Sequence, residues 1–272
     1  MSMQWYPGHM AKVRRELLHL LKGVDVVVET LDARIPAASR NPDLNELLGE
    51  AARAVALNKA DLADRAKTQR WVEYLGVQGP AVATDAQTGA GIRELLAGVQ
   101  DLARERLAAW MAKGRRRRPV RVMVVGIPNV GKSSVINRMA GRSGAKTGNV
   151  PGVTRGPQWL RVGQELELLD TPGLLWPKLG DPEVGFALAV TGAIDDRLFR
   201  MEEVALHLLA RLEKVAPGAV ATRYEVDMAT LSDLTAMLQA IGRRRGCLAA
   251  GGRVDLERAA AMVLNDFRKG RL

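Results

Sequence analysis

Several features that would each point to a particular class of protein are scarce or absent in this sequence. It holds one cysteine, Cys247, so neither an internal disulfide nor a cysteine-cluster zinc site can form. No apolar run approaches the roughly 20 residues that cross a bilayer. Residues 1–9 lack the charged-then-apolar pattern of a secretory signal. We therefore expect a cytoplasmic protein without a membrane segment or a disulfide partner.

Aromatic and acidic residues are also few. Aromatics make up 4% of the chain, so Leu, Val and Ala must build most of the core. The chain has 40 Lys and Arg against 30 Asp and Glu, which gives a formal net charge of +10. A basic excess of this size attracts polyphosphates and suggests a nucleic-acid partner. A compositional bias toward arginine would give the same charge without any such role.

The pattern of apolar residues changes near residue 180. Before it, strands alternate with helices, which predicts a mostly parallel sheet covered on both faces. The expected strands are 24–31, 53–57, 81–83, 120–125, 158–162 and 165–169, and the expected helices are 9–21, 63–75, 91–111 and 132–139. After it, only helices are expected, near 183–190, 197–215, 231–241 and 256–267. The sequence therefore predicts an α/β domain over 1–180 and a small all-helical domain over 181–272.

A phosphate-binding loop is the strongest motif. Gly126-Ile-Pro-Asn-Val-Gly-Lys-Ser133 follows an expected strand and opens an expected helix. Glycines let backbone N–H groups turn toward a phosphate, Lys132 can reach the terminal phosphates, and the Ser133 hydroxyl can bind Mg²⁺. The candidate phosphate-binding residues here are Asn129, Val130, Gly131, Lys132, Ser133 and Ser134.

A second motif, Asp170-Thr-Pro-Gly173, ends a later expected strand. Asp170 suits the acidic residue that holds Mg²⁺, and the Gly173 amide suits a contact with the γ-phosphate. Such a tetrapeptide alone is a common turn. Its distance from the phosphate-binding loop favours the functional interpretation.

Base choice is assigned to Asn58-Lys-Ala-Asp61, which also follows an expected strand. A carboxylate at Asp61 can accept from both N1–H and the exocyclic amine of guanine, a donor pair that adenine lacks. Asn58 tethers neighbouring loops, and the Lys59 stem can stack on the base. Asp85 and Ala86 form the expected second base loop, with the Ala86 N–H facing the guanine carbonyl.

The order of these motifs is unusual. In Ras-like GTPases the phosphate-binding loop comes first and the base-binding segments come last, whereas here the base-binding segments precede the phosphate segments. Strand pairing specifies a sheet regardless of which loop is opened to form the chain ends, so a chain with this order of motifs can keep the same fold. We therefore expect a circularly permuted P-loop GTPase domain that binds GTP and GDP. The cut leaves residues 170–173 just before the helical domain, so γ-phosphate occupancy is expected to move that domain.

Over essentially its whole length the chain resembles the ribosome biogenesis GTPase A family, bacterial factors of late large-subunit assembly. The resemblance rests on the permuted motifs and on three segments: Trp5-Tyr-Pro-Gly-His-Met10, Asp32-Ala-Arg-Ile-Pro36 and Gly148-Asn-Val-Pro-Gly-Val-Thr154. It implies a GTP-hydrolysing switch that binds the immature large (50S) subunit and its rRNA, is stimulated by the ribosome, and leaves after hydrolysis. It also implies that Thr154 completes Mg²⁺ coordination. Asn129 is similar to the asparagine of potassium-activated GTPases, which helps to bind an activating K⁺.

Two departures bear on mechanism. Leu174 stands where Ras-like proteins place a water-positioning glutamine, so another group or a partner must order the water. By the resemblance that group is His9; on the residues alone, an ordinary structural role for His9 is favoured over catalysis. Asp85 stands where the family usually has serine, and a carboxylate near the base could lower affinity.

The helical domain is the expected RNA-binding part. Its basic residues are Arg243, Arg244, Arg245, Arg253, Arg258, Arg268, Lys269 and Arg271, with Arg115 to Arg118 in the connector before the phosphate half. Arginine pairs with phosphates and stacks on bases, although a merely solvated basic face fits the same pattern. Two other functions stay open: a permuted GTPase of the small subunit, which would usually carry an N-terminal barrel or zinc module, and an RNA-binding scaffold that scarcely hydrolyses GTP.

Overall fold

The computed structural model describes residues 15, 18–49, 51–114, 118–141, 157–162, 164–173, 181–226 and 233–272. The chain divides into two compact units, Met1–Gly180 and Asp181–Leu272. Among the described residues, no helix is both long and apolar enough to cross a membrane.

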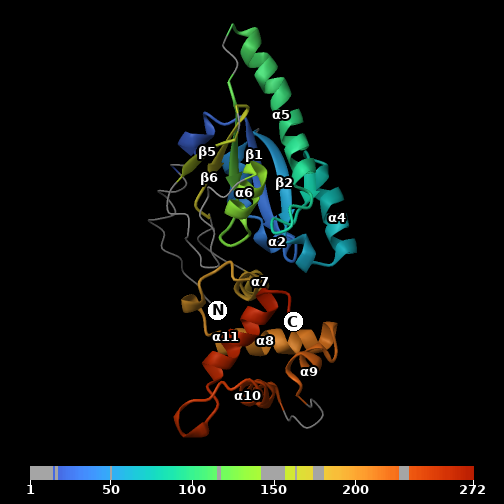
Figure 1. The fold of residues 1–272 in the computed structure, drawn as a ribbon, viewed down its shortest axis with the longest axis vertical. Helices are drawn as coiled ribbons and strands as arrows, with labels where there is room; N and C mark the ends of the chain where they lie inside the picture. Colours follow the sequence, from blue (N-terminus) through green and yellow to red (C-terminus); the bar gives the residue numbers. More distant parts are fainter. Residues whose placement is uncertain are drawn as a thin grey trace. The chain divides into compact units, whose positions relative to one another are not determined.

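A six-stranded sheet organises the first unit (Figure 1), in the order β3-β2-β1-β4-β6-β5. The strands are β1 (Val26–Asp32), β2 (Ala52–Asn58), β3 (Ala81–Ala83), β4 (Val120–Val125), β5 (Gln158–Val162) and β6 (Leu166–Asp170). All neighbouring strands run parallel except β5 and β6, which form the expected antiparallel hairpin. The prediction of a mostly parallel sheet is confirmed.

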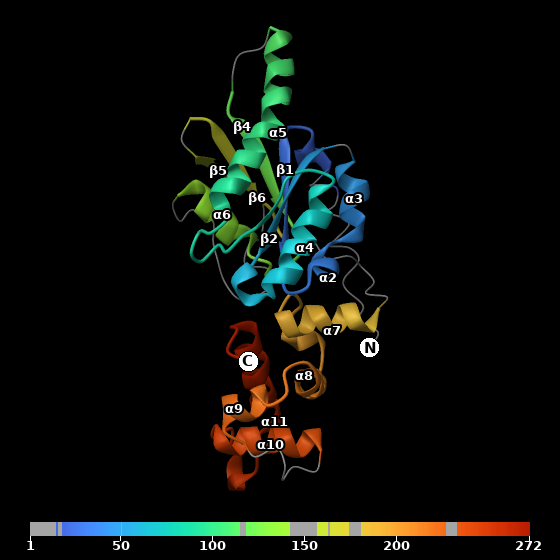
Figure 2. The ribbon, with the colours of Figure 1, turned by 90° about the vertical axis from the view of Figure 1, so that its right-hand side faces the viewer.

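Helices cover both faces of this sheet (Figure 2). They are α2 (Pro36–Ser39), α3 (Pro42–Leu48), η1 (Ala60–Leu62), α4 (Arg65–Gly76), α5 (Ile92–Ala112) and α6 (Lys132–Ala140). Val26 and Val28 point into a cluster with α5 and α6, whereas Val27 between them packs with α3 on the other face. The period of two along β1 thus places apolar side chains in both layers, which is why its sequence is a continuous apolar run.

The parallel strands end along one edge of the sheet, and this positions the motifs. Asp32 ends β1 opposite Asn58, which ends β2, and Asp170 ends β6 opposite Val124 of β4. The loop that follows β4 begins at Gly126. In open parallel sheets, ligands bind outside these carboxyl ends.

At the opposite edge, Asp25 anchors the chain just before β1. Its carboxylate accepts from both terminal nitrogens of Arg118 at 2.7 and 2.8 Å and from the Arg121 amide at 2.9 Å. The Arg118 guanidinium also lies 4.6 Å from the centre of the Trp110 ring on α5. These contacts fix the connection from α5 into β4, which is the connection that the permuted order requires.

The second unit is helical, as expected. It contains α7 (Pro182–Thr191), η2 (Asp196–Leu198), α8 (Met201–Val215), α9 (Ala219–Tyr224), α10 (Leu234–Arg244), η4 (Ala250–Gly252) and α11 (Leu256–Arg268). Helix α11 packs against α7, α8 and α10. An isolated bridge pairs Leu248 with Val254 between α10 and α11.

Several elements differ from the sequence-based expectations. Helices α2 and α3 were not predicted; α3 begins with Pro42 at its first position, and the Asn41 side chain accepts from the Asp43 amide at 2.9 Å. The single helix expected over 197–215 is split, because Asp195 caps the short η2 turn and α8 begins at Met201. Helix α9 was also missed, since its six residues are too few to show a period.

Candidate functional site

The loop between β4 and α6 folds in a way that only glycine permits. Gly126 has a φ of 148°, and a Cβ there would lie 2.4 Å from the carbonyl oxygen of Thr30. Gly131 has a φ of 97°, and a Cβ there would lie 2.2 Å from Nδ2 of Asn58. Gly131 is also the N-cap of α6 and has no side chain to accept from the first amides of that helix. A helix N-terminus of this kind favours an anion.

Lys132, the first residue of α6, is buried beneath this loop. Its Nζ donates to the carbonyl oxygen of Ile127 at 2.8 Å. Burial lowers the pKa of Lys132 to about 8, and the negative charge of Asp170 opposes the shift only in part. A phosphate in the loop would supply the counter-charge that the buried ammonium lacks, so the loop fits a phosphate-bearing ligand.

Two of the three residues expected to hold Mg²⁺, Ser133 and Asp170, lie together in the described part of the chain. The Ser133 hydroxyl donates to Oδ2 of Asp170 at 2.8 Å. The Thr171 hydroxyl donates to the carbonyl oxygen of Val124 at 2.7 Å, which holds the start of this segment against β4. A hydroxyl and a carboxylate are oxygen ligands that Mg²⁺ accepts alongside phosphate oxygens. Their proximity fits this ion.

Gly173 approaches the phosphate-binding loop closely. A Cβ there would lie 2.6 Å from the backbone nitrogen of Pro128, so no larger residue fits without a shift. Ser134, the remaining candidate on the loop side, is half-buried in the first turn of α6. The structure thus brings the two phosphate motifs together.

Asn58 connects the base-binding segments with the phosphate-binding loop. Its Nδ2 donates to the carbonyl oxygen of Val130 at 2.8 Å. Its Oδ1 accepts from the Ala86 amide at 3.1 Å and from the Thr84 hydroxyl at 3.4 Å. The Ala86 amide, which the sequence led us to expect at the guanine carbonyl, is bonded to Asn58 in this structure. It would contact a base only by exchanging that partner.

Lys59 makes a second connection. Its Nζ donates to the carbonyl oxygen of Asn129 at 2.6 Å and to Oδ2 of Asp32 at 3.0 Å. Its aliphatic stem therefore runs from the base-binding segment to the phosphate-binding loop. Asp61 lies in the η1 turn that follows, with its side chain exposed. An exposed carboxylate beside this stem can accept from the polar edge of a base.

Asp85 has a local role that the sequence did not reveal. Its carboxylate accepts from the Gln87 amide at 2.7 Å and from the Thr88 hydroxyl at 2.5 Å. Burial raises the pKa of the Asp85 carboxyl, but these hydrogen bonds outweigh burial and hold it below its ordinary value. The charge therefore closes the turn of the second base loop, which explains an aspartate at this position.

Arg138 is a further residue that sequence reasoning missed. It lies on α6, and its Nε donates to the carbonyl oxygen of Ala86 at 2.9 Å while its Nη2 donates to that of Gln87. The helix that follows the phosphate-binding loop is thereby tied to the second base loop. An arginine near a helix C-terminus is ordinary in sequence, so no signal identified it.

Three expected site residues lie outside the described part of the chain. They are His9, Thr154 and Leu174. The site as described consists of the phosphate-binding loop, the Ser133–Asp170 pair and the two base loops.

Comparison with known proteins agrees with this arrangement. A family model described as "50S ribosome-binding GTPase" matches residues 121–232. The match includes the phosphate-binding loop and Asp170 but not Asn58 to Asp61, as expected if the base-binding half has been moved to the front of the chain.

Full-length relatives are similar across both units. "Ribosome biogenesis GTPase A" from Priestia megaterium is 47% identical over 274 residues, covering 100% of this chain and 95% of its own. The protein of the same name from Bacillus cereus is 45% identical over 273 residues, covering 100% and 92%. Among solved structures, GNP-bound YlqF from T. maritima matches with a TM-score of 0.66 and 26% identity, covering 96% of this chain and 94% of its own.

The Asn58 contacts generate a stability prediction. Asn58→Ala would leave the Ala86 amide and the Val130 carbonyl without their partner in a buried region. Buried groups left unpaired cost about 1–3 kcal/mol each, so we expect a loss of about 2–4 kcal/mol in the free energy of unfolding, measured by urea titration. Thr84→Val, which removes only the long contact, should cost less than about 1 kcal/mol. An Asn58→Ala protein as stable as the wild type would contradict the bridging role.

Proposed function

The chain belongs to the ribosome biogenesis GTPase A family, and from this premise we propose that it is a switch of large-subunit assembly. As a member of that family it is a GTPase: it binds guanine nucleotides, hydrolyses GTP to GDP and phosphate, and acts in ribosome assembly. In the proposal, the GTP-bound protein binds the immature large (50S) subunit and promotes a late assembly step, and hydrolysis leads to release. The single observation that carries the GTPase site is the bridge from Asn58 and Lys59 to the phosphate-binding loop.

In this proposal, the phosphate half of the site binds the nucleotide through backbone and ammonium groups. The amides of Asn129, Val130, Gly131 and Ser134 face the phosphates, Lys132 neutralises their charge, and the Gly173 amide contacts the γ-phosphate. Mg²⁺, when bound, neutralises charge that develops on the phosphate oxygens. Ser133 and, by family resemblance, Thr154 would bind this ion, and Asp170 would hold it through water; the contact between Ser133 and Asp170 supports the assignment.

The residues of the two base-binding segments select guanine. Asp61 accepts from N1–H and the exocyclic amine of guanine, and its exposure leaves the carboxylate available for this. The Lys59 stem lies against the ring, and Asn58 holds Ala86 beside the base. Asp85 shapes the second base loop instead of contacting the base, as its bonds to Gln87 and Thr88 support.

Hydrolysis needs help from outside the described site. Leu174 has an aliphatic side chain, which cannot orient a water molecule. We assign this catalytic role to His9 and the binding of an activating K⁺ to Asn129, both by family resemblance. The ribosome orders these groups, which accounts for a reaction that is slow without it.

Four basic residues of the second unit are the proposed RNA contacts. Arg243, Arg253, Arg258 and Lys269 are exposed on and between α10 and α11. The other expected residues have internal partners. Arg268 pairs with Asp196 and donates to the carbonyl oxygens of Ala189 and Val190, Arg244 pairs with Glu225, Arg245 donates to the Arg223 carbonyl, and Arg271 pairs with Asp266.

The permuted order gives γ-phosphate a short path to the second unit. Residues 171–180 lead from Asp170 to the helix that begins at Pro182. We propose that contact between Gly173 and the γ-phosphate alters this segment and so changes how the helical unit engages the subunit.

The buried Lys132 generates a pH prediction. Its pKa of about 8 should rise when phosphate binds, so the lysine contributes fully to affinity below pH 8, and this contribution is lost as the pH rises. Calorimetric titration with GDP and Mg²⁺ in buffers of different ionisation enthalpy should show uptake of about half a proton at pH 8 and much less at pH 7. Equal uptake at both values would contradict the assignment.

The proposed partner is tested by steady-state GTP hydrolysis in K⁺ buffer, with the protein alone, with purified large subunits and with purified small subunits. We expect large subunits, and not small subunits, to stimulate GTP hydrolysis strongly. The increase should approach the roughly 10³–10⁵-fold range known for sites that a partner completes. Stimulation by small subunits alone would instead indicate the small-subunit alternative. Absence of stimulation by either would refute the proposed partner.

The same assay tests His9. His9→Ala should lose the stimulated rate while GTP binding persists, because the residue is assigned to water ordering and not to affinity. His19→Ala is the matched control, since His19 is an exposed helical histidine without an assigned role. Replacing K⁺ with Na⁺ should lower the stimulated rate if Asn129 helps to bind K⁺.

A further inference from the structure

The end of β1 carries a buried carboxylate to which no role in nucleotide binding has yet been given. Asp32 is 2% exposed and follows six residues of the central strand. We propose that Asp32 is a positioning residue for the nucleotide: through Lys59 it holds the base-binding segment against the phosphate-binding loop. This inference rests on the proposed role of Lys59 and deepens it.

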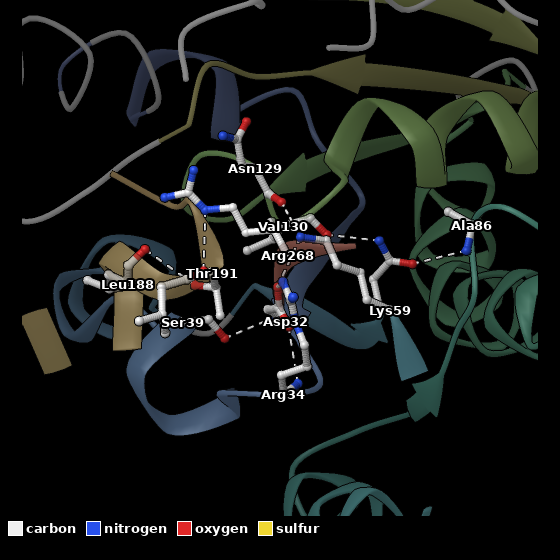
Figure 3. Close-up of polar contacts among 12 residues, drawn as sticks. Asp32, Arg34, Ser39, Lys59, Ala86, Asn129, Val130, Leu188, Thr191 and Arg268 are labelled. Atoms are coloured by element: carbon white, nitrogen blue, oxygen red, sulfur yellow. Dashed lines mark hydrogen bonds and ion pairs between the residues drawn. The ribbon is translucent and has the colours of Figure 1, made fainter. Parts of the chain in front are cut away.

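Asp32 contacts the ammonium group of Lys59 directly. Oδ2 of Asp32 accepts from Nζ of Lys59 at 3.0 Å, and the same Nζ donates to the Asn129 carbonyl oxygen at 2.6 Å (Figure 3). The ammonium therefore lies between a carboxylate at the end of β1 and the backbone of the loop after β4. If the Asp32 carboxylate were removed, the neutral Asn129 carbonyl would be the remaining one of these two partners of the ammonium.

Asp32 is itself held in place by neighbouring residues. Arg34 donates to both of its oxygens, from Nε at 2.9 Å and from Nη2 at 2.7 Å, and the Arg34 amide donates to Oδ1 at 3.1 Å. The Asp32 amide donates to the hydroxyl of Ser39, which donates in turn to the carbonyl oxygen of Pro36. Paired arginine contacts fix the plane of a carboxylate, so Asp32 presents one oxygen to Lys59 in a single direction.

The backbone is strained at both ends of the contact between Lys59 and Asn129. Lys59 and Asn129 have φ values of 62° and 58°, in the left-handed region that non-glycine residues rarely adopt. Such conformations are strained for residues other than glycine and persist only where the surroundings hold them. The Lys59 ammonium, held by Asp32, joins the two. Asp32 therefore supports the backbone of both binding loops as well as one side chain.

Electrostatics agree with this geometry. Burial raises the pKa of the Asp32 carboxyl, but the bonds from Arg34 and the charge of Lys59 outweigh it, and the pKa lies below its ordinary value. The carboxylate is thus charged at neutral pH and can hold the ammonium. Because the bridge acts on loop positions that GTP and GDP share, its loss should weaken both nucleotides alike.

Asp32→Asn tests the inference, and Asp25→Asn is the matched control. Asp25 lies just before the other end of the same strand and is also buried; like Asp32 it accepts two hydrogen bonds from one arginine, in this case from both terminal nitrogens of Arg118. Both variants lose a buried carboxylate and should lose stability. Titration of a fluorescent GDP and a fluorescent GTP gives the affinity of each folded protein.

We expect Asp32→Asn to raise Kd for both nucleotides by roughly tenfold to a hundredfold, the range for losing a charged hydrogen bond that orders a site. KM for GTP should rise similarly, whereas kcat should fall much less. Asp25→Asn should keep the wild-type Kd. Unchanged affinity in Asp32→Asn, or an equal loss in Asp25→Asn, would overturn the inference.

A second variant keeps the test open if Asp32→Asn does not fold. Lys59→Met keeps the aliphatic stem and removes the ammonium, so it should raise Kd by a similar factor; a wild-type Kd in this variant would overturn the inference. Where all variants fold, the double variant should be hardly weaker than either single one, because Asp32 acts through Lys59. Full additivity would overturn the inference. Failure of the wild-type protein to bind either nucleotide would instead refute the proposed function.

Discussion

Two side chains from one short segment hold the candidate site together. Asn58 and Lys59 each reach a backbone carbonyl of the phosphate-binding loop, and Asn58 spans 72 residues of sequence to do so. Asn58 also holds the second base loop, so three loops from three strand ends share one side chain. Because these loops follow parallel strands of one sheet, the sheet supplies the edge and the two side chains set the distances along it. Everything assigned to nucleotide binding depends on that geometry.

The same geometry explains why the permuted order is tolerated. Strand pairing places β1 between β2 and β4 whichever end of the chain comes first. The new connection, from α5 into β4, is fixed by Asp25 and Arg118 at the edge away from the site. The old connection after Asp170 is freed to lead into a second unit. Permutation thus changes what the segment after Asp170 is attached to while the contacts at the strand ends stay intact.

Much of this was predictable from sequence, for physical reasons. Buried strands are continuous apolar runs, and the phosphate and base motifs follow them, so the sheet, its permutation and the two halves of the site could all be predicted. The role of Arg138 could not, since its partners are backbone carbonyls without a sequence signature. Nor could the bonding of Ala86 to Asn58, or the internal pairing of Arg268, because both depend on which loops meet in space. His9 and Thr154 lie outside the described residues, so their roles remain predictions.

We propose that Asp61, which follows Asn58 and Lys59 in the base-binding segment, selects guanine. The most direct test compares the affinities of wild type and Asp61→Asn for GTP and for xanthosine triphosphate, which carries a carbonyl where guanine has its amine. The wild type should prefer GTP by roughly a hundredfold or more. The Asp61 carboxylate and the xanthine carbonyl are both acceptors, so neither can donate a hydrogen bond to the other. Asp61→Asn should reverse the preference, because an amide can donate to the carbonyl. A variant that still prefers GTP would contradict the account.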